Sequence, residues 1–117
     1  MIKSLLLVDD ESLFHLVFED ACSLLDIALH LKMVYTTDEA QSMFSRFAIE
    51  PAKKPECVFV DLNVVGSSFD GIELVRRINE DFKAGVVVGI ISSSSDEAEQ
   101  ERARLAGANF WIVKTDE

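Results

Sequence analysis

Short apolar runs alternate with longer amphipathic stretches along the chain, and two of the runs stop abruptly at carboxylates. Leu5-Leu6-Leu7-Val8 is followed by Asp9 and Asp10, and Cys57-Val58-Phe59-Val60 is followed by Asp61. Apolar runs of this length are typical of parallel strands that are buried on both faces of a sheet. Strands are therefore expected over residues 3–9, 33–35, 57–61, 86–91 and 110–113.

The stretches between these strands show the periodicity of amphipathic helices. Thr36 with Glu39, and Ser94 with Glu97, have the spacing of capping boxes that open a helix, and Gly107 suits a helix C-terminus. Helices are expected over residues 11–30, from 36 onward, over 71–83 and from 94 to 107. The order (βα)4β predicts a single α/β domain over residues 1–117, with right-handed crossovers and a doubly wound parallel sheet.

Periodicity also assigns a buried face to each helix. In the first helix it leaves His15 on the polar side and places His30 at the C-terminal end, where a basic residue is favourable. The fourth helix is polar nearly all round, so little burial and low local stability are expected. The apolar positions expected to face the sheet are, in helix order, Phe14, Val17, Ala21, Leu24, Leu25 and Ala28; Ala40, Met43, Phe44 and Phe47; Ile72, Val75, Ile78 and Phe82; and Ala98, Leu105 and Ala106.

The charge balance narrows the function classes. The chain has 117 residues and a formal net charge of −10, so direct nucleic-acid binding is not expected, because phosphate backbones select for Lys and Arg. The excess of acid suits a cation site and basic partner surfaces, although it is also common in ordinary soluble domains. No apolar run is long enough for a signal peptide or a membrane span. Cys22 and Cys57 are expected to be inert core thiols, which suits a cytoplasmic, reducing compartment.

Polar side chains follow four of the predicted strands. Asp9 and Asp10 follow the first strand, Asp61 ends the third, Ser92 follows the fourth and Lys114 follows the fifth. The carboxyl ends of parallel strands meet at one edge of the sheet, where ligands bind in open α/β folds. Three carboxylates that converge there repel one another unless positive charge or a phosphoryl group lies between them. Each residue alone has a simpler explanation, and Asp10 could be only a helix cap.

These residues lie in five ordered motifs: Leu-Leu-Val-Asp-Asp-Glu at 6–11, Val-Phe-Val-Asp-Leu at 58–62, Phe-Asp-Gly-Ile-Glu-Leu at 69–74, Ile-Ile-Ser at 90–92 and Gly-Ala-Asn-Phe-Trp-Ile-Val-Lys at 107–114. With them the sequence resembles the receiver domain of two-component response regulators, over essentially its whole length. The resemblance implies a flavodoxin-like, three-layer fold with strand order 2-1-3-4-5. It also implies a signalling module, whose only catalysis is its own phosphotransfer and dephosphorylation.

The resemblance assigns roles to the acidic residues. Asp61 matches the phosphoacceptor, whose carboxylate attacks phosphorus and becomes an aspartyl phosphate. Asp9 and Asp10 match the pair that binds Mg²⁺. Asp61 itself and the backbone carbonyl of Asn63 complete the implied protein ligands, and oxygen donors of this kind are what Mg²⁺ prefers.

Three further residues have implied roles near the phosphoryl group. Ser92 matches the hydroxyl that contacts the phosphoryl oxygen, and Lys114 matches the lysine that pairs with it. Trp111 occupies the position of the aromatic switch residue, which changes rotamer when Ser92 is drawn inward. Ordinary core packing remains an equal alternative for Trp111.

The sequence departs from the family pattern in three places. Thr115 follows Lys114 where a proline is usual. The loop from Asp61 to Gly71 is about two residues longer than the common form, and its Gly-Ser-Ser content predicts mobility. A fifth helix is absent after Lys114, so the first helix alone would cover one face of the sheet; further sequence or another chain, including a second copy, could supply the cover.

Three functions remain open at this point. The first is a phosphorylated switch that receives its phosphoryl group from a sensor histidine kinase or a phosphotransfer protein and acts on a downstream protein or an output domain. The second is an interaction module on the same fold that is never phosphorylated. The third, a hydrolase with Asp61 as nucleophile, is weaker, because Asn63 stands where haloacid-dehalogenase-type enzymes have a second aspartate. No membrane partner is expected.

Overall fold

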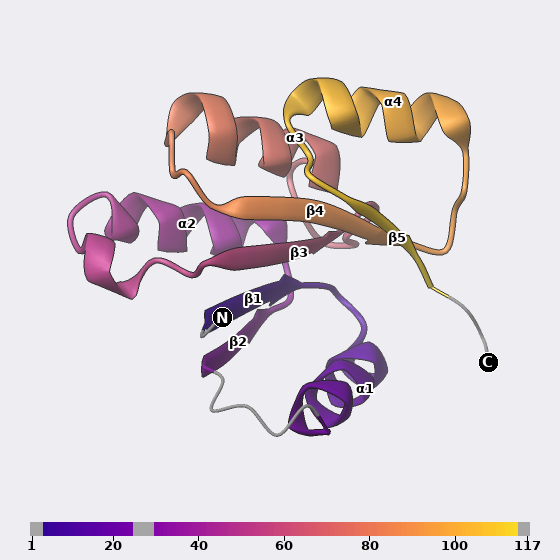
Figure 1. Cartoon of the computed structure of the whole chain (residues 1–117), viewed down its shortest axis with the longest axis horizontal. Coiled ribbons are helices and arrows are strands. Elements are labelled where there is room, and N and C mark those ends of the chain that lie inside the picture. The colour runs from indigo at the N-terminus through magenta and orange to yellow at the C-terminus, as the bar shows by residue number, and fades with distance from the viewer. Residues whose placement is uncertain (1–3, 25–29, 115–117) are drawn as a thin grey trace.

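The computed structural model describes residues 4–24 and 30–114 and contains a five-stranded parallel sheet. The sheet order is β2-β1-β3-β4-β5, as predicted (Figure 1). The strands are β1 Ser4–Val8, β2 His30–Val34, β3 Cys57–Asp61, β4 Val87–Ser92 and β5 Trp111–Val113. The second strand thus begins three residues earlier than expected.

The helices form two unequal layers around this sheet. The helical elements are α1 Ser12–Ser23, α2 Thr37–Phe47, the short 3₁₀ helix η1 Pro51–Lys53, α3 Gly71–Arg76, its π-helical continuation η2 Arg77–Asp81, and α4 Glu97–Ala106. Three of them (α2, α3 and α4) lie on one face, and within the described residues α1 is the one helix on the other face (Figure 1). No helix in residues 4–24 or 30–114 combines the length and apolar character that a membrane crossing requires.

The main core lies between the sheet and the three-helix layer. Successive strand residues point to opposite faces, so Leu6 and Val8 of β1 meet Phe44 of α2 on this side. The expected inner faces of α2 and α3 are confirmed, since Ala40, Met43 and Phe44, and Ile72, Val75 and Ile78, are all buried. In α4 the buried anchor is Ala103, whereas the expected anchors Leu105 and Ala98 are exposed.

The prediction for the first helix is wrong in its length and its orientation. The helix ends at Ser23, and His30 begins β2 rather than ending the helix. Val17 and Leu24 are exposed, whereas His15, expected to be solvated, is buried at 4% exposure. Phe18 packs edge-on against Phe59 of β3 at 5.1 Å between ring centroids. Predicted positions Leu25 and Ala28 lie outside the described residues.

The two predicted capping boxes have different outcomes. Thr36 accepts a hydrogen bond from the Glu39 amide, so the first box is confirmed. The second is wrong: Asp96 caps α4 by accepting from the Ala98 amide at 2.8 Å. The hydroxyl of Ser94 instead donates to the Glu99 carboxylate. An aspartate directly before the helix satisfies the free amides of the first turn better than a serine two residues further away.

Candidate functional site

The sheet register brings the carboxyl ends of four strands to the same level. Val8 of β1 is level with Val60 of β3, Asp61 with Ile91 of β4, and Ser92 with Val113 of β5. The polar residues that follow these positions therefore share one edge of the sheet. Asp9, Asp61 and Ser92 are buried there, at 0%, 8% and 3% exposure. Such burial of two carboxylates is costly without a compensating charge.

Lys114 supplies that charge. Its Nζ lies 2.7 Å from Oδ2 of Asp9, 3.5 Å from Oδ2 of Asp61 and 3.7 Å from Oε1 of Glu11. The ammonium also lies 4.1 Å from the centroid of the Phe14 ring, on which a cation is favourable. Asp9, which follows β1, and Phe14 of α1 thus fix the position of the Lys114 ammonium. Thr115, which replaces the usual proline, lies outside the described residues.

The first loop is shaped by two contacts to Asp9. Its side chain accepts a hydrogen bond from the Glu11 amide at 2.9 Å. Its backbone carbonyl lies 2.6 Å from Nε2 of His15. A carbonyl can only accept, so this ring nitrogen carries a proton. The ring of His15 also stacks on Tyr35, with centroids 4.4 Å apart, so the histidine is fixed between the loop and the end of β2.

The electrostatics of the site raise the pKa of Asp61 to about 6. Burial is the main cause, and the charge of Asp9 adds to it, while Lys114 acts in the opposite direction. For Lys114, burial alone would lower the pKa, but the hydrogen bond to Asp9 and the charges of Asp61 and Glu11 outweigh it and raise the pKa. At neutral pH Asp61 is therefore mostly ionised and lies beside a protonated Lys114.

Three carboxylates form a cluster around the Lys114 ammonium that could hold one cation. Among the described residues, Asp9, Glu11 and Asp61 each offer an oxygen within 4.8 Å of the others. Hard oxygen donors with a surplus of negative charge fit a small divalent cation. The predicted ligand Asp10 is not in this group, although its charge contributes to the raised pKa of Asp61. Asn63 is exposed in the loop after β3.

Asp10 does not act as a helix cap either. The residue at the N-cap of α1 is Glu11, and no side chain makes a capping hydrogen bond there. The simpler explanation for Asp10 is therefore wrong, and its half-buried carboxyl remains beside the acidic group.

Ser92, the last residue of β4, and Trp111, the first residue of β5, both form hydrogen bonds to Ser94 of the β4–α4 loop. The hydroxyl of Ser92 accepts a hydrogen bond from the Ser94 amide at 3.0 Å. The indole Nε1 of Trp111 donates to the carbonyl of the same Ser94 at 3.1 Å. Trp111 is half-buried against the main core. A change at Ser92 would therefore reach Trp111 through a single loop residue.

The long loop after β3 is tied to the start of α2, contrary to the mobility expected from its composition. The Thr37 amide donates to Oγ of Ser67 at 2.9 Å, and the Thr37 hydroxyl donates to the Phe69 carbonyl at 2.7 Å. Asp38 accepts from the Ser68 amide at 2.8 Å. These bonds give the loop a defined path between the acidic site and α2.

Gly71 begins α3 in close contact with the end of β3. A Cβ atom at this position would lie 2.2 Å from the backbone oxygen of Asp61. The Gly71 amide donates to the Leu62 carbonyl at 2.9 Å. Glycine therefore allows α3 to approach the strand closely enough to fix the backbone of Asp61.

Three site residues were missed by the sequence analysis: Glu11, Phe14 and His15. Glu11 belongs to one of the quoted motifs, so a further carboxylate beside Asp9 and Asp10 was visible in the sequence. Phe14 was assigned to the helix core without a role at Lys114. His15 had no usable sequence signal, because its burial depends on the rotation of α1 about its axis.

Comparison with known proteins agrees with this geometry. The family model of the response regulator receiver domain matches residues 5–117. A search of the curated proteins gave no match.

Three solved structures share the fold. The phosphorylated cyanobacterial phytochrome response regulator RcpA is 22% identical with a TM-score of 0.85, covering 100% of this chain and 84% of that chain. A Burkholderia pseudomallei response regulator with a phosphorylated aspartic acid, a calcium ion and citrate is 19% identical with a TM-score of 0.79, covering 98% of this chain and 61% of that one. NtrX from Brucella abortus is 24% identical with a TM-score of 0.81, covering 100% of this chain and 24% of NtrX.

Proposed function

The chain belongs to the response regulator receiver domain family, and from this premise we propose that it is a phosphoacceptor switch whose phosphorylated residue is Asp61. The observation that carries the proposal is the environment of this carboxylate. It is buried at the end of β3, has a pKa of about 6, and has Lys114 Nζ at 3.5 Å.

The proposed reaction is a phosphoryl transfer to a carboxylate oxygen. An oxygen of ionised Asp61 attacks the phosphorus of a phosphohistidine, the new P–O bond forms, and the P–N bond breaks with its electron pair returning to the imidazole. Lys114 then pairs with a phosphoryl oxygen, and the Ser92 hydroxyl donates to another. Both residues act by charge neutralisation and positioning, and they are held close to Asp61 by the sheet.

A divalent cation, Mg²⁺ in this proposal, would be held by the acidic group. Asp9 and Asp61 are the ligands on which the sequence pattern and the geometry agree, and Glu11 is the third carboxylate of the group. When bound, the cation supplies positive charge that offsets the charge developing on the transferred group. The Burkholderia pseudomallei response regulator, whose structure contains a calcium ion together with a phosphorylated aspartic acid, is consistent with a divalent cation in this proposal.

The switch itself would run from Ser92 to Trp111. Movement of the Ser92 hydroxyl toward a phosphoryl group removes the acceptor of the Ser94 amide. Because the Ser94 carbonyl holds the Trp111 indole, the loop and the indole would respond together. Phosphorylation thereby shifts the population between two arrangements of this loop.

The proposed partners and location follow from the reaction. A sensor histidine kinase or a phosphotransfer protein supplies the phosphoryl group, and a downstream protein or output domain senses the switch. A cytoplasmic location fits the free thiols of Cys22 and Cys57.

The direct test is phosphorylation from a small donor. The protein is incubated with acetyl phosphate and Mg²⁺, and intact mass is followed. We expect the gain of one phosphoryl group that hydroxylamine removes, and Asp61→Asn should abolish it. Asp20→Asn, which removes an exposed carboxylate of α1, is the matched control and should label like the parent. Equal labelling of the Asp61→Asn protein would exclude Asp61 as acceptor.

A second candidate is an interaction module that is never phosphorylated. It is favoured by the replacement of the usual proline by Thr115. The two candidates differ in their response to cations, because Mg²⁺ at ten times its dissociation constant stabilises a fold with an intact site by roughly 1.4 kcal/mol. A melting temperature that stays constant through a Mg²⁺ titration would favour the second candidate.

A further inference from the structure

A cavity of about 760 Å³ lies at the edge of the sheet opposite to the acidic site. It opens between the C-terminal half of α2, η1 and the first residues of β1 and β2. Cavities of this volume hold drug-sized molecules in other proteins. No role in the proposed phosphotransfer requires it.

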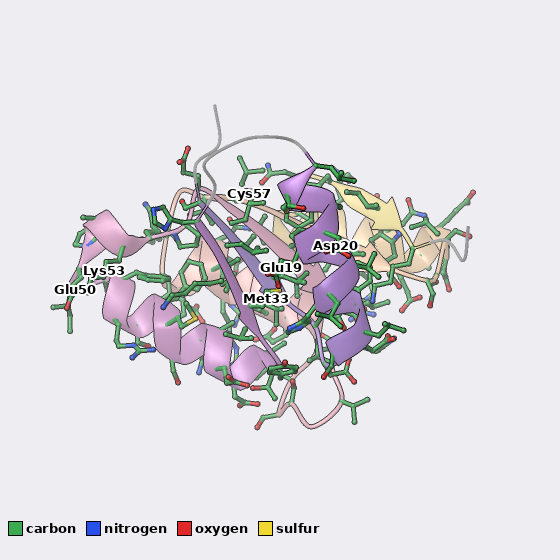
Figure 2. The ribbon with its side chains drawn as sticks, turned by 90° about the horizontal axis from the view of Figure 1, so that it is seen from below. Glu19, Asp20, Met33, Glu50, Lys53 and Cys57 are labelled. Atoms are coloured by element: carbon green, nitrogen blue, oxygen red, sulfur yellow. The ribbon has the colours of Figure 1, made fainter. Side chains whose placement is uncertain are left out.

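The lining of this cavity is rich in basic residues, whereas the molecule as a whole is acidic. Within residues 4–24 and 30–114, four Lys or Arg side chains line it, in a protein of net charge −10. Among the described residues that line it, Glu50 is the one carboxylate, and it is paired with Lys53 at 2.8 Å. Figure 2 shows these two side chains together beyond the end of α2. The four basic side chains are Lys32, Arg46, Lys53 and Lys54.

Lys32 lies on the inner face of the sheet. It is level with Leu6 of β1, whose side chain belongs to the main core beneath α2. Parallel neighbours in register point to the same side, so Lys32 points toward the α2 layer. Met33, the next residue, lies on the face that α1 covers (Figure 2). Lys32 is therefore an exposed lysine on the same side of the sheet as the core residues of β1.

Two of the basic groups are available for a ligand. Lys53 pairs with Glu50, and the Lys54 ammonium donates to the Ala84 carbonyl. Lys32 and Arg46 make no side-chain hydrogen bond or ion pair with any residue that the structure describes, although the charge of Arg46 helps to lower the pKa of Glu50. The surface beside them is apolar, and it is formed by Leu5, Leu6, Leu31, Met43, Phe47 and Pro55.

Two structural explanations account for only part of this arrangement. Arg46 lies in the last turn of α2, where a cation is favourable. Lys32 lies in the edge strand, where an inward-pointing charge discourages pairing with other chains. Neither explanation requires a cavity of this size with an apolar wall beside both charges.

We propose that this cavity binds an amphipathic organic anion, a small molecule with a carboxylate or phosphate head and an apolar body. The head pairs with Lys32 and Arg46, and the body lies against Leu6, Met43 and Phe47. We favour a small molecule over a peptide because the volume of about 760 Å³ lies in the range that drug-sized ligands occupy.

The test uses probes that separate the head from the body. The ¹⁵N-labelled protein is titrated with decanoate, decyl phosphate, 1-decanol and inorganic phosphate, and amide shifts are recorded. We expect saturable shifts around Leu6, Lys32, Met43 and Phe47 with one or both decyl anions, and the anion that binds more tightly identifies the preferred head. Decanol and inorganic phosphate should each bind at least tenfold more weakly than that anion.

Charge variants test the role of the two cations. The Lys32→Gln/Arg46→Gln protein should bind the preferred anion at least tenfold more weakly. The Lys83→Gln/Arg102→Gln protein removes the same charge from positions outside the cavity and should bind within twofold of the parent. Matching amide spectra away from the cavity confirm that both variants are folded.

Four results would overturn the proposal. Equal binding of decanol would show an apolar cavity without anion recognition, and equal weakening by the control pair would show an effect of net charge alone. If neither decyl anion gives saturable shifts, no anion binds, and Lys32 serves only to discourage pairing of the edge strand with other chains. Tight binding of an acidic amphipathic peptide, with none of either decyl anion, would make the cavity a protein-docking site.

Discussion

Asp61 holds its proton more tightly in the folded protein than in the unfolded chain. Its pKa of about 6, raised by burial and by the charge of Asp9, exceeds the unfolded value of about 3.9. The folded state therefore binds more protons than the unfolded state between about pH 4 and pH 6. The free energy of unfolding consequently falls as the pH rises through this window.

Replacement of Asp61 by asparagine should remove this dependence. At pH 7.5 we expect the Asp61→Asn protein to be more stable than the parent by up to roughly 3 kcal/mol, and the difference should shrink toward zero near pH 4. Urea unfolding at several pH values measures it. Asp20→Asn should show no such pH-dependent gain. A gain that is constant from pH 4 to 7.5 would contradict the assigned pKa.

His15 positions the loop that carries Asp9. Substitution by leucine keeps the site filled but leaves the Asp9 carbonyl without its donor, so we expect a loss of about 1–3 kcal/mol of stability. Weaker Mg²⁺ binding should accompany the loss, measured by calorimetric titration of the folded variant. The exposed neighbour substitution Leu16→Ala should change stability by less than about 0.5 kcal/mol. Unchanged Mg²⁺ affinity in His15→Leu would show that the histidine serves packing alone.

At the scale of elements, the loop from β3 to α3 owes its order to α2. Its glycine and serine residues have little local preference for one path, but Thr37 and Asp38 bind its backbone and side chains. The N-terminus of α2 is capped, because the Thr36 side chain accepts from the Glu39 amide and the Glu39 carboxylate accepts from the Tyr35 amide. The loop beside Asp61 is thereby held by residues that lie 30 to 32 positions earlier in the chain.

Thr37→Val tests this attachment. Valine keeps the volume but cannot donate to the Phe69 carbonyl, so we expect a loss of about 1 kcal/mol of stability. Amide hydrogen exchange over residues 66–70 should become faster, because local opening becomes easier. Ser42→Ala, an exposed change on the same helix, should leave both quantities unchanged. A slower or equal exchange rate in Thr37→Val would mean that other contacts order the loop.

At the scale of the molecule, the two faces of the sheet are covered unequally. Leu13, Leu16, Val17 and Leu24 of α1 are exposed at 72%, 61%, 54% and 84%. Exposed apolar groups on the one helix of this face, within the described residues, favour association. The net charge of −10 opposes it by repulsion between copies.

We expect concentration-dependent self-association that strengthens with salt, because screening weakens the repulsion. Sedimentation velocity at two NaCl concentrations measures it. The Leu13→Glu/Leu16→Glu protein should remain monomeric, whereas Leu105→Glu, an exposed change on α4, should associate like the parent. A parent protein that is monomeric under all these conditions would contradict the prediction.

From the sequence pattern alone, the alternation of strands and helices and the grouping of most site residues could be predicted, whereas the strand order followed from the resemblance to the receiver family. Buried parallel strands need continuous apolar runs, and their polar ends must meet at one edge, so Asp9, Asp61, Ser92 and Lys114 could be grouped from local pattern alone. The sequence also predicted the cores of α2 and α3, because their periodicity is unambiguous. These properties depend on short stretches of chain and on the geometry common to all parallel sheets.

Features that depend on how the elements are rotated and packed against one another could be read only from the folded structure. The α1 sequence is apolar on several sides, so only contact with β3 and Tyr35 selected His15 and Phe18 as its inner residues. The same rotation placed Phe14 under Lys114 and Glu11 beside Asp61. The order of the β3–α3 loop and the basic cavity likewise arise between segments distant in sequence, where no local pattern carries the information.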